Sequence, residues 1–212
     1  MVLKTLQRLS APGGEIVTLT EAKNYLRVEV GQDDALITFW IKAARALVEK
    51  ETRRSILTQR WSLSLSNCSL DVGQVASGVA PVFFDGMLAL PRAPLQAVES
   101  IRYYANGVLT TWDASNYVVV PGSPGKVRPV FGRSWPAADW RDDAIVVTFR
   151  AGFGDTVADV PEDLLEAARL GVFLCLGNWY ENRSATVLGT ISSELPFGFE
   201  AVLSPLQYGA YC

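Results

Sequence analysis

Hydrophobic residues change their spacing twice along the chain. From about residue 33 to 54 they recur every three or four positions, the period of a helix with one buried face. Between about 58 and 152, short segments that alternate apolar with polar residues lie between turn signals, which is typical of strands. Helical spacing returns from Pro161 onward. This order predicts an α+β fold, in which a small helical bundle formed by the N- and C-terminal helices carries an inserted antiparallel β unit.

The same signals divide the chain into five predicted segments. Residues 1–17 are expected to form a flexible N-terminal arm, because Ala-Pro-Gly-Gly at 11–14 interrupts regular structure. The helical part 18–57 and the core helix 153–183 are expected to build the bundle. Residues 58–152 supply the inserted β unit, and residues 184–212 add a short C-terminal helix and a tail.

Local signals sharpen the first helical part. Thr18 and Glu21 have the spacing of a capping box, in which each side chain bonds a free backbone N–H at the start of a helix. Arg45 and Glu49 of the next helix are predicted to lie away from its main hydrophobic stripe. That stripe consists of Leu36, Ile37, Trp40, Ile41, Ala44, Leu47, Val48 and Glu51.

Strand signals dominate the central region. Trp61, Leu63 and Leu65 alternate with serines, which predicts a half-buried strand. The pair Asn106-Gly107 separates two apolar runs, and such a pair suits the positive φ angles of a tight hairpin turn. The sequence therefore predicts a β-hairpin at 101–112 within the β unit.

The stretch Gly-Asn-Trp-Tyr-Glu-Asn-Arg at 177–183 ends the last long helix. Trp179 closes an apolar stripe and is predicted to be a core anchor. Glu181 and Arg183 are predicted to mark where the helix leaves the core, so that the chain from Ser184 onward can reach a partner. The stripe consists of Leu165, Ala168, Val172, Cys175 and Trp179.

Composition narrows the classes of function. The net charge is -3, and the absence of a dense basic run argues against nucleic-acid binding by phosphate neutralisation. The chain contains no histidine, the usual general base and the commonest metal ligand. Its three cysteines lack a CxxC spacing, so neither a metal site nor a disulfide framework is indicated. No signal peptide or membrane span is evident, and we expect a protein made in the cytoplasm.

Two clusters of side chains have a functional interpretation beside the structural one. Acidic residues gather at 139–143 and 155–163, but they lack the paired arrangement of a glycosidase and the spacing of a calcium loop. A carboxylate-based hydrolase is therefore the least favoured class. The aromatic residues Trp135, Trp140, Tyr103 and Tyr104 would suit a carbohydrate- or peptide-binding module, and would equally suit a β core or subunit contacts.

The order of these parts resembles the head-tail connector (adaptor) proteins of long-tailed bacteriophages and gene transfer agents. The resemblance extends over about residues 17–206. It is carried by these stretches in order: VTLTEAKNYLRV, DDALITFWIKAARALVEKETRRSILTQRWSLSL, LPRAPLQAVESIRYY, YVVV, FGRSWPA, VTFRAGFGDTVADVPEDLLEAARLGVFLCLGNWYENR and ISSELPFGFEAVLSP.

The resemblance implies a structural protein without catalytic, cofactor or metal sites. It implies a homo-oligomeric ring, expected to be a dodecamer, that sits under the portal protein in the virion. Such a ring extends the DNA channel without sequence-specific binding and receives a tail-side connector or tail terminator protein. Membranes play no part. By position, the segment after Arg183 would dock on the portal, and Leu206, Tyr208 and Tyr211 are the predicted contact residues.

Overall fold

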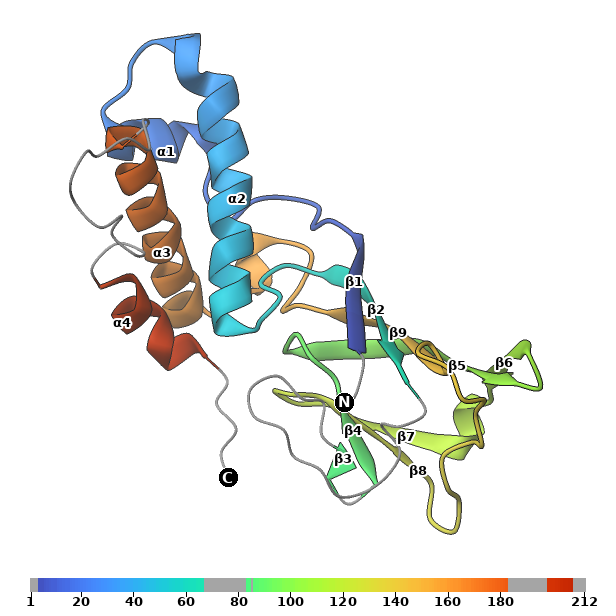
Figure 1. The fold of residues 1–212 in the computed structure, drawn as a ribbon. Coiled ribbons are helices and arrows are strands. Elements are labelled where there is room, and N and C mark those ends of the chain that lie inside the picture. Colours follow the sequence, from blue (N-terminus) through green and yellow to red (C-terminus); the bar gives the residue numbers. More distant parts are fainter. Residues whose placement is uncertain (1–3, 67–82, 85, 183–197, 208–212) are drawn as a thin grey trace, which may run out of the picture. The chain divides into compact units, whose positions relative to one another are not determined.

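The protein consists of two compact units (Figure 1). A computed structural model describes residues 4–66, 83–84, 86–182 and 198–207. The β unit contains Met1–Pro12 and Leu57–Phe153, and the helical unit contains Gly13–Ile56 and Gly154–Cys212. The combination of α-helices with antiparallel sheets confirms the predicted α+β class.

Two long helices form the centre of the helical unit. Helices α2 (Asp34–Thr52) and α3 (Glu162–Glu181) pack against each other, and α1 (Leu19–Leu26) and α4 (Phe199–Leu203) each contact both (Figure 1). Single 3₁₀ turns lie at Gly31–Asp33, Val157–Asp159 and Ser204–Leu206. The buried apolar side chains of the four helices are Ala22, Ile37, Ile41, Ala44, Val48, Leu164, Ala168, Val172, Cys175, Leu176, Phe199 and Leu203.

The predicted capping box at the start of α1 is confirmed. The backbone N–H of Glu21 donates to the Thr18 hydroxyl at 3.2 Å, and the Thr18 N–H donates to the Glu21 carboxylate at 2.8 Å. Arg169 of α3 pairs with the same carboxylate. The backbone bond from Thr18, with help from the Thr18 hydroxyl and Arg169, holds the pKa of Glu21 below its ordinary value.

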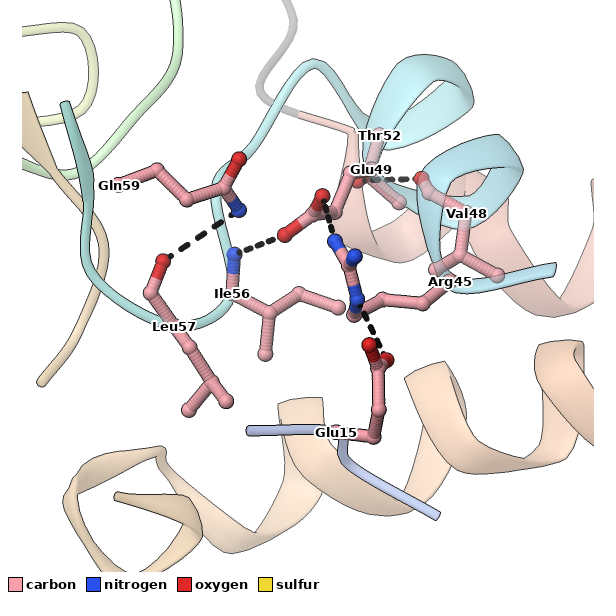
Figure 2. Close-up of polar contacts among 8 residues, drawn as sticks. All are labelled: Glu15, Arg45, Val48, Glu49, Thr52, Ile56, Leu57 and Gln59. Carbon is pink, nitrogen blue, oxygen red and sulfur yellow. Dashed lines mark hydrogen bonds and ion pairs between the residues drawn. The ribbon is translucent and has the colours of Figure 1, made fainter. Parts of the chain in front are cut away.

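Arg45 and Glu49, which the sequence places away from the apolar stripe of α2, are nevertheless buried. Both side chains are 4% exposed, and they form an ion pair at 2.6 Å (Figure 2). The Arg45 Nε also donates to Glu15 at 2.7 Å, and the second oxygen of Glu49 accepts from the Ile56 N–H at 3.0 Å. The chain that precedes α1 and the chain that follows α2 therefore contact this side of α2, so its buried face is wider than the apolar stripe.

The β unit contains two antiparallel sheets. The five-stranded sheet has the order β1-β2-β9-β5-β6, with β1 Lys4–Ser10, β2 Gln59–Leu65, β9 Ile145–Ala151, β5 Leu95–Ala105 and β6 Val108–Trp112. The four-stranded sheet has the order β3-β4-β8-β7, with β3 Phe83–Phe84, β4 Met87–Ala89, β8 Lys126–Pro129 and β7 Tyr117–Val120. Leu88 and Val127 of the smaller sheet share one core with the large residues of the other.

Residues 4–10 form an edge strand and not the flexible arm that the sequence suggested. Strand β1 pairs with β2 in antiparallel register, and Leu6 lies opposite Leu63. Leu6 packs against the core of the β unit, whereas its neighbours Thr5 and Gln7 on the other face are exposed. Arg8 is on the same face as Leu6 but is exposed. Charged side chains are common on edge strands because they hinder pairing with other chains, and here they concealed the period of two.

The hairpin and the alternating strand are both confirmed. Trp61, Leu63 and Leu65 are buried, whereas Ser62 and Ser64 between them are half-buried. Asn106 and Gly107 have φ angles of 53° and 78°, as the tight turn between β5 and β6 requires. The carboxylate of Asp139 accepts hydrogen bonds from both of their N–H groups, at 2.9 and 2.7 Å.

We expect Arg45→Met to lower the free energy of unfolding by about 3 to 5 kcal/mol, because it leaves the buried Glu49 carboxylate without its cationic partner. Urea unfolding of the full chain would measure the change. Lys42→Met, at an exposed position of the same helix, should change stability by no more than about 0.5 kcal/mol. Equal effects of the two substitutions would contradict a stabilising role for the buried network.

The lowered pKa of Glu21 predicts a pH dependence. A carboxyl group whose pKa is lower in the folded state stabilises that state above its ordinary value of 4.5, and this stabilisation is lost as the pH falls through the lowered pKa. We therefore expect the stability of Glu21→Gln to decrease less than that of the parent as the pH falls from about 6 to 3. Thermal unfolding at each pH would measure this difference. Glu29→Gln, at an exposed position, controls for the loss of one charge. If the parent and Glu21→Gln lost the same amount of stability over this pH range, the prediction would be contradicted.

Candidate functional site

The predicted portal-contact residue Leu206 lies inside the helical unit. It ends the 3₁₀ turn after α4, and its side chain is 9% exposed. Its carbonyl accepts a hydrogen bond from the Arg54 Nε at 2.7 Å. Tyr208 and Tyr211, the other two predicted contact residues, lie outside the described residues. Leu206 therefore anchors the end of the described chain to the helical unit, and portal contact by the three residues stays a prediction.

Helix α4 makes this anchoring possible. Phe199 and Leu203 are fully buried, and the methyl groups of Leu203 lie close to Gly171 of α3. A Cβ at Gly171 would be 3.1 Å from Leu203 and 3.2 Å from Val48 of α2, so the glycine lets the three helices approach closely. The C-terminal helix expected from the apolar spacing of Phe199, Leu203 and Leu206 is confirmed.

The prediction that Trp179 is a core anchor is wrong. Trp179 is half-buried, and it lines an open hollow at the surface of the helical unit with Phe39, Trp40, Ala43 and Asn182. Phe39 is 65% exposed. We call this feature the aromatic hollow. It lies between the first half of α2 and the end of α3, and large apolar side chains that stay accessible are typical of surfaces that bind partners.

Trp40 of the aromatic hollow packs against another aromatic side chain. The ring of Trp40 meets that of Tyr180 edge to face, with 6.3 Å between the centroids. The Tyr180 hydroxyl donates to Asp33 at 3.4 Å, and Tyr25 stacks on Phe173 at 4.9 Å. These aromatic contacts join α3 to α1 through Phe173 and to α2 through Tyr180, whereas Trp179 stays half-buried.

The four aromatic residues proposed as a stacking platform have different surroundings. Trp135 packs on Trp112 at 5.1 Å, and its indole N–H donates to the Gly86 carbonyl at 2.9 Å. Tyr103 packs against the core of the β unit. The Arg141 guanidinium lies 3.4 Å above the centre of the Tyr104 ring. Trp140 alone of the four is largely exposed, at 84%, so they present no common flat surface for a sugar ring.

Carboxylates of the acidic clusters mostly serve local structure. Asp139 caps the β5–β6 turn, and Asp159 accepts from the Thr156 N–H at 2.9 Å. Asp143 forms an ion pair with Arg141 that holds the pKa of Asp143 below its ordinary value. Within the described residues, no group of three or more acidic or cysteine side chains is placed to hold a metal ion.

Two further features bear on chemistry and location. Burial raises the pKa of the Cys175 thiol to about 11, so this cysteine stays protonated and unreactive at neutral pH. Among the described helices, none combines the length and apolar composition that crossing a membrane requires.

Phe131 is the partner-binding candidate that sequence reasoning missed. It is fully exposed, and it occupies the second position of a four-residue turn from Val130 to Arg133. The turn is closed by the Arg133 N–H, which donates to the Val130 carbonyl at 3.0 Å, and Gly132 has a φ of 79°. The dipeptide Phe-Gly after a strand was the available signal, since glycine is favoured at the third position of such a turn.

Phe199 is fully buried and Trp179 is half-buried, so we expect their replacement by alanine to lower the free energy of unfolding by different amounts. Phe199→Ala should lower the free energy of unfolding by about 3 to 5 kcal/mol, because it opens a cavity in the core. Trp179→Ala should cost less than about 2 kcal/mol, because its side chain is already partly hydrated. Guanidinium unfolding of both variants would compare them. If Trp179→Ala lowered the free energy of unfolding more than Phe199→Ala, the prediction that Trp179 is a core anchor would stand.

Comparison with known proteins identifies structural relatives. No protein-family model matches the chain, and no curated protein sequence matches it significantly. The chain is similar to one in a structure described as the neck of an empty gene transfer agent particle computed with C6 symmetry. The identity is 25%, the match covers 98% of this chain and 97% of that one, and the TM-score is 0.67.

Two other structures match over the same shares of both chains. One is the neck of a native gene transfer agent particle computed with C12 symmetry, at 24% identity and a TM-score of 0.67. The other is the virion of a native gene transfer agent particle, at 24% identity and a TM-score of 0.65. The similarity therefore includes both units of the chain.

Proposed function

We propose that the protein is a structural head-tail connector of a phage-like particle. In this proposal it forms a ring under the portal, extends the DNA channel and receives the next tail component. It acts through its shape and its protein interfaces, without catalysis. The observation that carries the proposal is the match to a chain of a gene transfer agent neck, which includes 98% of this protein and 97% of its relative.

The symmetry of the relatives supports a ring. Their particle necks were computed with C6 and C12 symmetry. A cyclic ring needs a heterologous interface, in which each copy presents two different surfaces to its two neighbours. Exposed aromatic side chains occur in both units, with Phe131 in one and Phe39 in the other. Aromatic residues are enriched at the centres of protein interfaces, where they bury a large area at a low entropic cost.

The charge of the chain supports a channel that DNA can slide through. A ring lined densely with basic side chains would bind the phosphates and resist movement of DNA. The chain is mildly acidic overall, with 22 acidic and 19 basic residues. This property is compatible with passage of DNA without sequence-specific binding.

We assign docking on the portal to the segment after Arg183, with Leu206, Tyr208 and Tyr211 as its predicted contact residues. The buried side chain of Leu206 and its bond to Arg54 hold the last part of this segment on the helical unit. A short tail with the anchors Tyr208 and Tyr211 binds weakly by itself, but twelve tails on one ring would bind together and gain avidity. The proposed dodecamer thus turns a weak contact into a stable joint.

Electron microscopy of the purified protein mixed with portal rings tests the proposed function. A matched ring stacked on the portal is the expected result. Deletion of residues 207–212 should weaken portal binding by tenfold or more, a change of at least about 1.4 kcal/mol in the binding free energy, as measured by co-sedimentation. A truncated protein that joins portal rings normally would remove the tail from the docking role.

The deletion is designed to spare Leu206, because truncating that buried side chain would disturb the helical unit itself. Tyr208→Ser combined with Tyr211→Ser should reproduce the effect of the deletion, and Cys212→Ser should not. Thermal unfolding of each variant provides the control for folding. A protein that never forms rings, with or without the portal, would contradict the proposed function as a whole.

A further inference from the structure

The β unit presents the fully exposed side chain of Phe131 on a hydrogen-bonded turn. Phe131 lies at the tip of the turn that follows β8, and a backbone bond on each side restrains it. The Val130 N–H donates to the Asn116 carbonyl, and the Arg133 N–H donates to the Val130 carbonyl, both at 3.0 Å. Because the backbone of this turn is already ordered, it loses little conformational entropy when the turn binds a partner.

The helical unit presents a recess of suitable size and character. The aromatic hollow has a volume of about 360 Å³, and three aromatic side chains and Ala43 form most of its lining. A cavity of about 150 Å³ can hold a benzene molecule, so the hollow has room for a phenylalanine ring. Ring-to-ring contacts with Trp40 and Trp179 would add edge-to-face or stacked attraction to the burial of apolar area.

The two units carry opposite net charges. The β unit has ten basic and seven acidic residues, whereas the helical unit has nine basic and fifteen acidic residues. In the chain around Phe131, the side chains of Arg128 and Arg133 are exposed. Glu181 is exposed directly before Asn182 of the hollow, and Lys42 is the exposed basic residue beside Ala43. The β unit of one copy is therefore attracted to the helical unit of another.

We propose that neighbouring copies in the ring meet by insertion of Phe131 of one copy into the aromatic hollow of the next. This inference rests on the proposed ring and specifies its interface. Each copy contributes a knob from its β unit and a recess from its helical unit, so the contact is heterologous and can repeat around a closed ring. Central aromatic anchors in pockets carry most of the binding energy in many interfaces, and the charges around them guide association.

Disulfide cross-linking between two singly substituted copies tests the contact. In a background with Cys68→Ser and Cys212→Ser, one copy carries Phe131→Cys and a second, longer tagged copy carries Ala43→Cys. The copies are mixed, assembled with portal rings and oxidised. We expect the mixed cross-link to exceed both self-cross-links. Trp140→Cys provides the matched control, because it is also an exposed aromatic position in the β8–β9 connection, and it should not cross-link to Ala43→Cys.

Self-association supplies an independent measurement. Phe131→Ala should raise the concentration at which rings form by tenfold or more, whereas Trp140→Ala should leave it within about twofold of the parent. Both positions are exposed, so both variants should fold, and thermal unfolding checks this. Mass photometry would count the assembled rings.

The outcomes separate this inference from the proposed function. Rings that form equally well with Phe131→Ala, or a cross-link from Trp140→Cys as strong as that from Phe131→Cys, would overturn the interface and leave the connector function standing. Parent protein that forms no ring even with portal present would overturn both.

Discussion

One arginine and two carboxylates in the interior of the helical unit restrict how its chain can be arranged. Arg45 and Glu49 are almost inaccessible to water, and removal of Arg45 would take its ion pair from both Glu49 and Glu15. Their bonds reach Glu15, in the chain that precedes α1, and Ile56, in the chain that follows α2. The entry to the helical unit and the exit from it are therefore held against the same side of α2. Helix α2 also contacts α1, α3 and α4.

Helix α2 connects that constraint to the surfaces proposed for binding. Its first half lines the aromatic hollow with Phe39, Trp40 and Ala43. Directly after its last turn, Arg54 holds the carbonyl of Leu206 and so fixes the start of the proposed docking tail. A substitution near the start of α2 would alter the aromatic hollow, and one just after its end would alter the position of Leu206. This arrangement suits a connector, whose partners bind at separate places and must keep a fixed geometry within each unit.

The predictions that depended on neighbouring residues were the accurate ones. The capping box of Thr18 and Glu21 and the turn of Asn106-Gly107 use groups within three positions of each other, and local backbone geometry determines them. The errors concerned contacts between distant segments. The burial of Arg45 was not predicted because its partner Glu15 lies 30 positions away. The edge strand β1 was missed because its partner β2 begins almost 50 residues later in the chain. The charged side chains of β1 also interrupt the alternation of apolar and polar residues by which a strand is recognised in a sequence.

By itself the sequence determined the α+β class, the positions of the long helices and several strands, and the resemblance that led to a particle connector. Periodicity and turn chemistry are properties of short segments, so they can be read without the fold. The tertiary structure decided which polar groups are buried and which apolar groups stay exposed. It placed Arg45 and Glu49 in the interior, Leu206 against the helical unit, and Trp179 and Phe131 at the surface. Burial depends on which segments cover a residue, and those segments are distant in the chain.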